Sequence, residues 1–514
     1  MKILSAKEMR LWDQYSIQHE PIASIDLMER SAGKCADWLE ENGYVENEFT
    51  IFCGKGNNGG DGLAIARMLA AKKYPTTVNI LDPIATGSGH KGTEDFQTNL
   101  ARLHQYPGVD IRFIQTEENF HELKKDKIII DALFGSGLNR AIDGVTAKLI
   151  DHINNSGCEI ISIDIPSGLF TETSSKVNPI IKAKHTLSFQ CFKSAFLVAE
   201  NAEYVGEVHI LDIGLHKDFY NSIQNGNELV DDTIIHSIYK PRNRFAHKGN
   251  FGHALLVAGS YGKIGAAVLS AKACMRSGVG LLTCHIPKCG YYILQSTVPE
   301  AMLMTDFNAE FNTKVDDDLN KYESIGIGPG IGTASETKMM LKEIFDSYRS
   351  PVVIDADGLN IISTEKDLLK LIPPGSILTP HPKEFERLFG ESLPAGQAVA
   401  NDFDWIQLAL QKAKVLNLVI VLKGHHTFIA TPEGKGFFNS TGNAGMATAG
   451  SGDALTGILT GLIAQGYSSA ETAILGVYLH GLAGDFAAKE FSMEAMIASD
   501  IIENLGAAFS SLNS

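Results

Sequence analysis

Short apolar runs alternate with stretches of helical periodicity along the first half of the chain. Residues 1–43 have the pattern of two helices, opened by a capping-box sequence at 5–8. A helical pattern also covers 146–156. The strand-like runs are 49–53, 76–81, 111–115, 127–133, 159–165, 184–190 and 206–213. This alternation predicts a parallel sheet with helices on both faces.

A polar segment, 215–233, interrupts this pattern and contains Asn-Gly-Asn, so we expect the domain boundary there. A second alternating series follows. Its apolar runs are 253–259, 280–286, 324–328, 351–356, 376–380, 418–424 and 426–431, and helical patterns near 452–465, 468–488 and 499–511 end the chain. Each half is long enough to bury its own core, which predicts two α/β domains.

Charge, hydropathy and cysteine content bear on the partners and the cellular location that the sequence predicts. The 514 residues carry a net charge of −16, which disfavours nucleic acid or an anionic membrane surface as a general partner. No apolar run approaches the length of a membrane helix, and the first residues lack the apolar core of a signal peptide. Seven cysteines without a C-x-x-C pair predict reduced thiols in a cytoplasmic protein.

The turn at 54–62, GKGNNGGDG, raises the first functional question. Gly54, Gly56 and Gly59 fit the dinucleotide fingerprint G-x-G-x-x-G, and Asp82 lies about where a ribose-binding acid is expected. Asp61 argues against an ordinary NAD site, because a carboxylate at a helix start repels pyrophosphate. A tight turn with an Asn pair and a helix-capping Asp is the structural alternative.

Polar side chains end several strands of the first half. Because ligands of open α/β sheets bind beyond the carboxyl ends of the strands, one crevice can gather Asn58, Asp131 and Ser167. Their oxygens carry one formal negative charge, which suits a monovalent cation better than magnesium. Asp164 then stays available as an acid or base. A single Asp at a strand end is, however, often only a cap or turn former.

The stretch 439–466 in the second half places a glycine-rich turn before a long helix that is expected to start near Asp453. Backbone N–H groups of 449–452 can cradle a phosphate there. Asp453 is then placed to accept a hydroxyl proton during phosphoryl transfer. The structural alternative is a glycine-rich helix start with Asp in its first turn.

Three further features of the second half have two interpretations each. The segment GIGPGIG, 326–332, is either a phosphate loop or a point of close backbone approach. His381 in TPHPKEFERL either points into a cleft or is a structural histidine. Lys423 closes an apolar run, where it either meets nucleotide phosphate or is an ordinary surface lysine.

Together, GNNGGDG, DALFGSGL, DIPSG, TPHPKEF and AGSGDALTG resemble the bacterial bifunctional NAD(P)H-hydrate repair enzymes. The resemblance covers nearly the whole chain. It implies a Rossmann-like three-layer αβα epimerase domain (YjeF N-terminal-like) at 1–222. A ribokinase-like αβα dehydratase domain is implied at 228–514. The run MATAGSGDA departs from the G-A-G-D of sugar kinases and matches the dehydratase branch better.

The resemblance also implies site residues. The hydrated substrate, NADHX or NADPHX, would contact Asn57, Asn58, Gly59, Gly60, Asp61, Gly135, Ser136, Gly137, Leu138, Asn139, Arg140, Ala141 and Asp164 in the first domain, and Ala266, Gly330, His381 and Asp453 in the second. Potassium would bind Asn58, Asp131 and Ser167. The adenine nucleotide would contact Lys423, Gly424, His425, His426, Thr427 and Gly452.

The implied chemistry acts on a hydroxyl at C6 of the nicotinamide ring. Epimerisation needs loss and return of that hydroxyl, with Asp164 as the expected acid or base. Dehydration would transfer phosphate from ADP to the hydroxyl, with Asp453 as base, and release AMP and phosphate. Magnesium is expected on general phosphoryl-transfer grounds, although the sequence shows no dedicated carboxylate cage for it.

Three rival functions remain open. An ATP-dependent small-molecule kinase would use the same Asp453 chemistry but release a stable phosphorylated product. An interaction protein is a second rival, because related epimerase-like domains occur in an mRNA-decapping enhancer and an apolipoprotein-binding protein. An NAD-dependent dehydrogenase is disfavoured by Asp61 and by the second domain. Family membership further implies a homo-oligomer.

Overall fold

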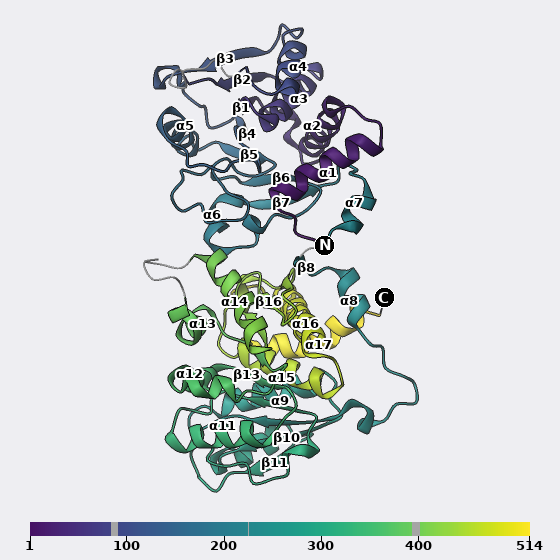
Figure 1. Ribbon diagram of the computed structural model, residues 1–514, viewed down its shortest axis with the longest axis vertical. Helices are drawn as coiled ribbons and strands as arrows, with labels where there is room; N and C mark the ends of the chain where they lie inside the picture. Colours follow the sequence, from purple (N-terminus) through teal and green to yellow (C-terminus); the bar gives the residue numbers. More distant parts are fainter. Residues whose placement is uncertain (84–90, 225, 393–400, 514) are drawn as a thin grey trace. The chain divides into compact units, whose positions relative to one another are not determined.

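The computed structural model describes residues 1–83, 91–224, 226–392 and 401–513. Contacts within the chain divide it into two compact units, one formed mainly by Lys2–Asn225 and the other mainly by Gly226–Ser514. Each unit has its own sheet and is described by itself (Figure 1).

The first unit contains a seven-stranded sheet of order β3-β2-β1-β4-β5-β6-β7, in which every pair is parallel. The strands are β1 (Phe49–Cys53), β2 (Thr76–Leu81), β3 (Asp110–Ile114), β4 (Ile128–Ala132), β5 (Glu159–Ile163), β6 (His185–Phe189) and β7 (Glu207–Leu211). All residues of β1 and β4 are buried, as expected of strands covered on both faces. The strand order reverses between β1 and β4, which is where open α/β sheets bind ligands.

Helices cover both faces of this sheet. They are α1 (Ala6–His19), α2 (Ser24–Glu41), α3 (Asn57–Ala71), α4 (Glu94–Leu103), α5 (Gly144–Asn154), α6 (Ala202–Val205) and α7 (Lys217–Ser222). Figure 1 shows α2, α3 and α4 on one side of the sheet and α5 on the other. The face under α5 is apolar, with Leu149, Ile150 and Ile153 packed against residues of β1, β4 and β5.

The second unit contains a ten-stranded sheet of order β11-β10-β9-β12-β13-β14-β15-β16-β17-β8. The pairs that β16 makes with β15 and β17 are antiparallel and the others are parallel. The strands are β8 (Asn227–Leu229), β9 (His253–Val257), β10 (Leu281–Ile286), β11 (Met302–Thr305), β12 (Ser324–Ile327), β13 (Val352–Ile354), β14 (Ile377–Leu378), β15 (Val419–Leu422), β16 (Phe428–Ala430) and β17 (Gly436–Phe438).

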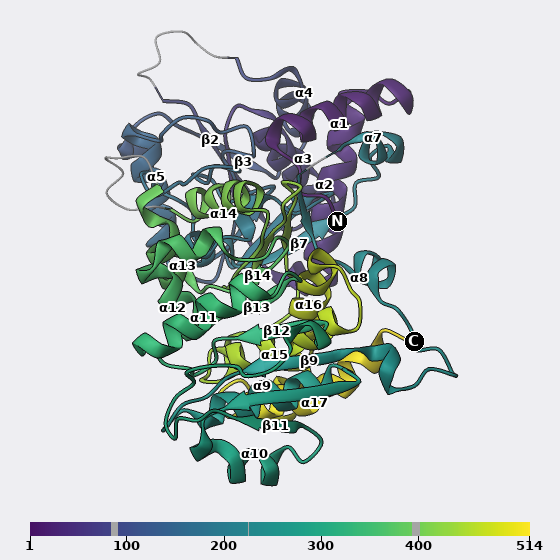
Figure 2. The same cartoon turned by 60° about the horizontal axis from the view of Figure 1, so that its bottom comes forward.

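The described part of the second unit contains ten α-helices. They are α8 (Asp232–Ile238), α9 (Ile264–Arg276), α10 (Tyr291–Thr297), α11 (Ser335–Ser347), α12 (Ala356–Thr364), α13 (Pro382–Phe389), α14 (Asp402–Leu416), α15 (Ser451–Ala464), α16 (Ser469–Phe491) and α17 (Ala498–Ser511). Figure 2 shows α9, α15 and α17 together, apart from α11, α12 and α13. Most of α15 is buried in the core, including Leu455, Ile458 and Leu462. The N-terminus of α15 is therefore fixed by the packing of the helix in the core.

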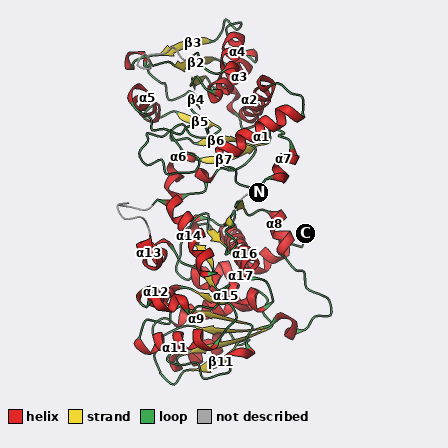
Figure 3. Cartoon of the chain, viewed as in Figure 1, coloured by secondary structure: helices red, strands yellow, loops and turns green. Residues whose placement is uncertain are grey.

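The predicted fold class is confirmed: both units are α/β with mainly parallel sheets (Figure 3). Each apolar run given above overlaps a strand, and the three C-terminal helices lie where the pattern predicts them. Three strands were not predicted, namely β8, β11 and β17, each of three or four residues. No helix in the described part of the chain has the length and apolar character needed to cross a membrane.

Candidate active sites

Close backbone packing builds the first site. The turn after β1 leads into α3, whose N-cap is Gly56. A Cβ on Gly59 would lie 1.7 Å from the carbonyl oxygen of Gly54, and one on Gly54 would lie 2.0 Å from that of Leu133. Only glycine fits at such approaches. The turn at 54–62 is thereby pressed against the loop that follows β4.

A cavity of about 690 Å³ opens at this point. Its walls include Asn57, Asn58, Asp61 and Asp164, together with the loop residues Gly135, Ser136, Gly137, Leu138, Asn139 and Arg140. Of the predicted substrate contacts in this domain, Gly59, Gly60 and Ala141 do not line it in the described structure. A Cβ on Gly60 would lie 2.8 Å from the sulfur of Met28, so this glycine serves helix packing.

Asp164 follows β5 in a left-handed backbone conformation, with φ of 68°. Strained backbone of this kind clusters at functional sites. Its carboxylate accepts a hydrogen bond from the N–H of Ser136 at 2.8 Å and pairs with the ammonium of Lys193 at 2.9 Å. Burial by itself would raise the pKa of Asp164, but Lys193 and Ser136 together hold it below its usual value. Asp164 is therefore a fixed anion.

Two other carboxyl groups in the cavity, those of Asp61 and Asp13, have raised pKa values. Burial, followed by repulsion from Asp164 and Asp13, raises the pKa of Asp61 well above its usual value. For Asp13 on α1, burial and Asp164 raise the pKa to about 7, against a smaller lowering effect of Lys193. Asp61 is 8% exposed and does not cap α3, whose N-cap is Gly56. Asp82, the expected ribose-binding acid, pairs with Lys55.

The predicted potassium ligands are partly brought together. Asp131 is fully buried, and its oxygens accept bonds from the hydroxyl of Ser167 at 2.6 Å and its N–H at 2.9 Å. Ser162 and the N–H of Leu133 also bond to Asp131. Asn58 lies instead beside Gly135, close to Asp164. A Cβ built on Gly135 would lie 3.3 Å from the Cβ of Asn58 and 2.9 Å from a carboxylate oxygen of Asp164. Both amide atoms of Asn58 are buried without a partner among the described residues.

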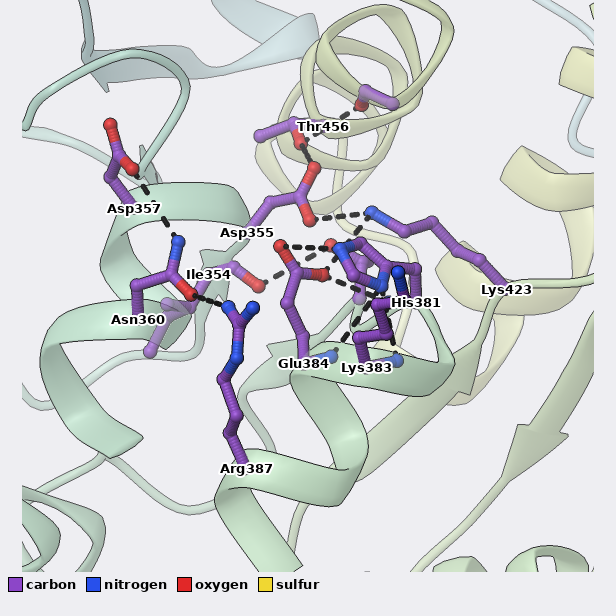
Figure 4. Close-up of polar contacts among 12 residues, drawn as sticks. Ile354, Asp355, Asp357, Asn360, His381, Lys383, Glu384, Arg387, Lys423 and Thr456 are labelled. Atoms are coloured by element: carbon purple, nitrogen blue, oxygen red, sulfur yellow. Dashed lines mark hydrogen bonds and ion pairs between the residues drawn. The ribbon is translucent and has the colours of Figure 1, made fainter. Parts of the chain in front are cut away.

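The second site surrounds the start of α15, whose N-cap Gly450 is left-handed with φ of 91°. Asp355, 2% exposed, follows β13 and accepts bonds from Lys423 at 2.8 Å and from Thr456 of α15 at 3.0 Å (Figure 4). A Cβ on Gly452 would lie 3.4 Å from the ammonium of Lys423 and 3.5 Å from Asp355. Lys423 is therefore a partly buried cation paired with Asp355, and not an ordinary surface lysine.

His381 and Glu384 complete this cluster from α13. The Nδ1 of His381 accepts the N–H groups of Lys383 and Glu384 and so caps the helix, as Figure 4 shows. One carboxylate oxygen of Glu384 accepts the N–H of His381 at 2.9 Å and lies 4.0 Å from the Lys423 ammonium. Burial raises the pKa of Glu384, against the lowering effect of Lys423.

Asp453 lies in the first turn of α15. Burial, followed by repulsion from Asp355, raises its pKa to about 6, although Lys423 acts in the opposite direction. A carboxylate with this pKa is ionised at neutral pH and can still take up a proton. A pKa in this range suits the general-base role that the sequence suggested for Asp453.

A cavity of about 610 Å³ adjoins this cluster. Of the predicted residues, it is lined by His381, Lys423, Gly424, His425, Thr427 and Gly452. His426 is turned to the carbonyl oxygen of Asn439 instead. Ala266 and Gly330 lie side by side, with 3.2 Å between the Cβ of Ala266 and a Cβ built on Gly330. A Cβ on Gly328 would lie 1.9 Å from the carbonyl oxygen of Asp355, so the 326–332 loop is a close backbone approach.

Four important side chains were missed in the sequence. Asp355 directly follows β13, and the strand-end argument that singled out Asp131 would have found it. Glu384 lies in the motif TPHPKEF, but the sequence alone does not indicate its contact with Lys423. Asp13 and Lys193 have no local signal, because a polar residue on a helix and a lysine in a loop are ordinary.

Comparisons with known proteins match both halves. A family model described as NAD(P)H-hydrate dehydratase matches residues 254–506, and one described as YjeF-related protein N-terminus matches residues 24–195. The structure of the ADP/ATP-dependent NAD(P)H-hydrate dehydratase from Bacillus subtilis, co-crystallised with ATP and Mg²⁺, is 28% identical. It covers 56% of this chain and 100% of that chain, with a TM-score of 0.48.

Curated relatives extend the match to the full length. The bifunctional NAD(P)H-hydrate repair enzyme Nnr of Moorella thermoacetica is 35% identical over 98% of this chain and 96% of that protein. The protein of the same name from Thermofilum pendens is 30% identical over 100% and 97%, and that from Escherichia coli is 30% identical over 93% and 88%. The resemblance drawn from the motifs is confirmed, and the chain belongs to the family of bifunctional NAD(P)H-hydrate repair enzymes.

Proposed function

We propose that this chain repairs hydrated nicotinamide dinucleotides in two steps. Residues 1–222 interconvert the R and S forms of NADHX and NADPHX. Residues 228–514 dehydrate the S form with ADP and release NADH or NADPH, AMP and phosphate. The observation that carries the proposal is the cluster of Asp453, Asp355, Glu384 and Lys423 at the start of α15, in a chain whose relatives bear the repair-enzyme name.

The dehydration follows from the position of Asp453. Its carboxylate takes the proton of the C6 hydroxyl while the hydroxyl oxygen attacks the terminal phosphorus of ADP, and AMP leaves. The ring nitrogen then pushes its electron pair toward C6, the C–O bond to phosphate breaks, and a proton is lost from C5. Phosphorylation thus replaces hydroxide, a poor leaving group, with phosphate, a far better one. Lys423 offsets the negative charge of that phosphate.

Magnesium fits the charge balance of this site. Asp355, Glu384 and Asp453 are three carboxylates around one lysine, Lys423, so the cluster carries excess negative charge. Asp355 and Glu384 are the residues that would hold the ion, because carboxylate oxygens are its preferred protein ligands. When bound, magnesium neutralises charge on the transferring phosphoryl group.

The pH dependence of dehydration follows from the same base. Asp453 must be ionised to accept the proton, and its pKa is raised to about 6 by burial and Asp355. We expect the dehydration rate to be constant near neutral pH and to fall tenfold per pH unit below about pH 6. A pH series with saturating ADP and S-NADHX measures this. A rate that holds down to about pH 4, the usual range of a free Asp, contradicts the assignment.

One experiment separates this function from the rival kinase. S-NADHX, ADP and magnesium are incubated with the protein, and products are followed by ³¹P NMR. Repair yields AMP, inorganic phosphate and reduced nicotinamide in equal amounts. A kinase for another alcohol leaves NADHX and ADP unchanged, and this result would overturn the proposal.

Epimerisation is assigned to the cavity beside Asp164. Removal of the C6 hydroxyl leaves a planar, positively charged ring that accepts water on either face. The Asp164 carboxylate is fixed by Ser136 and Lys193, and a fixed anion stabilises such a cation without reorganising.

Potassium fits the first site at Asn58. The carbonyl oxygen of this side chain is buried without a partner among the described residues, and an unsatisfied buried group costs about 1–3 kcal/mol. Asp131 and Ser167, which bond to each other, are the other residues that would supply oxygens to the ion. Bound there, potassium adds a weakly held positive charge beside the substrate.

We therefore expect potassium chloride to raise the melting temperature of the parent protein above its value in choline chloride of equal ionic strength. In the Asn58→Ala variant this potassium-specific difference should disappear, because its carbonyl ligand is gone. Differential scanning fluorimetry measures both. An undiminished potassium effect in Asn58→Ala places the ion elsewhere.

The remaining assignments are broader. We propose a homo-oligomer, as the family resemblance implies. A cytoplasmic location is proposed because all seven cysteines are unpaired, and five of them are buried.

A further inference from the structure

Asp13 is a carboxylic acid that the cavity of the first site holds without a partner. It stands on α1, is partly buried and lines the cavity with Asp61, Asp164 and Lys193. No hydrogen bond or ion pair to its carboxyl is found among the described residues of the structure. An acid of this kind is free to exchange a proton with a molecule in the cavity.

Asp164, in contrast to Asp13, has a partner at each carboxylate oxygen. Lys193, 1% exposed, pairs with its carboxylate at 2.9 Å, also donates to its carbonyl oxygen at 3.3 Å, and bonds to Ser188. The N–H of Ser136 donates to the second carboxylate oxygen at 2.8 Å. Both oxygens are thus held by donors, so that a proton on Asp164 would have to displace one of them.

Two carboxyl groups whose surroundings favour opposite charge states divide the work of acid and anion between them. We propose that Asp13 is the catalytic residue that moves the proton in the epimerase site, while Asp164 with its positioning residue Lys193 stays an anion that stabilises the cationic ring. This assignment rests on the proposed epimerase function and deepens it. It moves the acid and base role from Asp164, where the sequence put it, to Asp13.

The carboxyl of Asp13 gives its proton to the C6 hydroxyl oxygen, the C6–O bond breaks, and water is formed. The electron pair on the ring nitrogen becomes the second bond between nitrogen and C6. Water then adds to the other face of C6 and returns a proton to the Asp13 carboxylate, which gives the other epimer with no net consumption of any reactant.

Asp61 is the competing proton carrier, because it is also a buried carboxyl without a described partner. It lies deeper, on α3, and is 8% exposed. The other charged groups that line the cavity with Asp13 are Arg10, Lys55, Asp95 and Arg140. Arg10, one turn before Asp13 on the same helix, contacts the loop at Gly137. The test therefore includes Asp61→Asn beside Asp13→Asn.

The experiment uses the full chain without any nucleotide, so that dehydration is silent. Pure R-NADHX is added with potassium, and formation of the S epimer is followed by chromatography, with the spontaneous rate subtracted. We expect Asp13→Asn to lower the rate about 10²- to 10³-fold and Asp13→Glu to retain part of it. Asp37→Asn, an exposed acid on α2, is the matched control and should keep the parent rate.

A pH profile adds a signature that a merely structural role would not give. Asp13 must be protonated to act, and its pKa is raised to about 7 by burial and Asp164. The parent rate is therefore high below about pH 7 and falls tenfold per unit above it. The residual rate of Asp13→Asn should lack this fall. Far-UV circular dichroism verifies that the variant is folded.

The outcomes separate the two levels of the proposal. A parent protein that interconverts the epimers no faster than buffer overturns the epimerase function itself. An active parent with Asp13→Asn within about threefold of its rate overturns only the role of Asp13. If the rate of Asp61→Asn no longer falls above pH 7, while that of Asp13→Asn still does, then Asp61 and not Asp13 moves the proton.

Discussion

We expect the Asp453→Asn substitution to lower the rate of ADP-dependent dehydration about 10³-fold, because the amide cannot accept the hydroxyl proton. Asparagine keeps the size of the side chain and adds no strain to the first turn of α15. The Ser270 hydroxyl bonds to the backbone carbonyl of Asp453, so that contact is retained. Initial rates of reduced-nicotinamide formation from S-NADHX and ADP measure the effect.

Two comparisons make this prediction specific. Glu386→Gln removes an exposed carboxylate from the nearby helix α13 and should leave dehydration unchanged. Epimerisation, assayed without nucleotide, should be unchanged in Asp453→Asn, because that chemistry is assigned to the other domain. Dehydration by Asp453→Asn within about tenfold of the parent would move the base to another residue.

The second large effect is expected from Lys193→Met, which should destabilise the first domain by about 3–5 kcal/mol. Lys193 is 1% exposed, and its ammonium bonds to the carboxylate and carbonyl of Asp164 and to Ser188. Methionine fills the space but leaves the Asp164 charge uncompensated. Epimerisation should fall as well, because loss of Lys193 removes the main contact that lowers the pKa of Asp164 and so weakens the anion that stabilises the ring.

Urea unfolding followed by tryptophan fluorescence measures this, since Trp12 and Trp38 lie buried in the first domain. The double variant Lys193→Met/Asp164→Asn should regain most of the lost stability, because neither charge remains, without regaining epimerisation. A Lys193→Met protein within about 1 kcal/mol of the parent would show that the pair is well solvated and contradict the account.

The positions of strands could be predicted from the sequence where the strands are buried on both faces. β1 and β4 are unbroken apolar runs and were placed within a residue or two. β11 has partly exposed or exposed residues only, and β17 has three residues. Strands that short, lying toward the edges of a sheet, carry too few residues for a periodic signal.

The sites were predictable only where local sequence determines them. Asp131, Asp164 and Asp453 follow from strand ends and a glycine-rich helix start. The pairing of Asp164 with Lys193, and the place of Asp13 beside them, depend on packing between elements far apart in sequence. The interpretation of 54–62 as an ordinary NAD turn weakens for the same reason, since Asp82 is engaged by Lys55.

The most direct test of the central claim is to give the purified chain an equal mixture of R- and S-NADHX with ADP, magnesium and potassium. The return of reduced-nicotinamide absorbance is then followed, with early time points used because the epimers also interconvert spontaneously. We expect prompt recovery of the whole mixture. Recovery that stops promptly at the S half contradicts the epimerase assignment, and no recovery with either ADP or ATP contradicts the repair function as a whole.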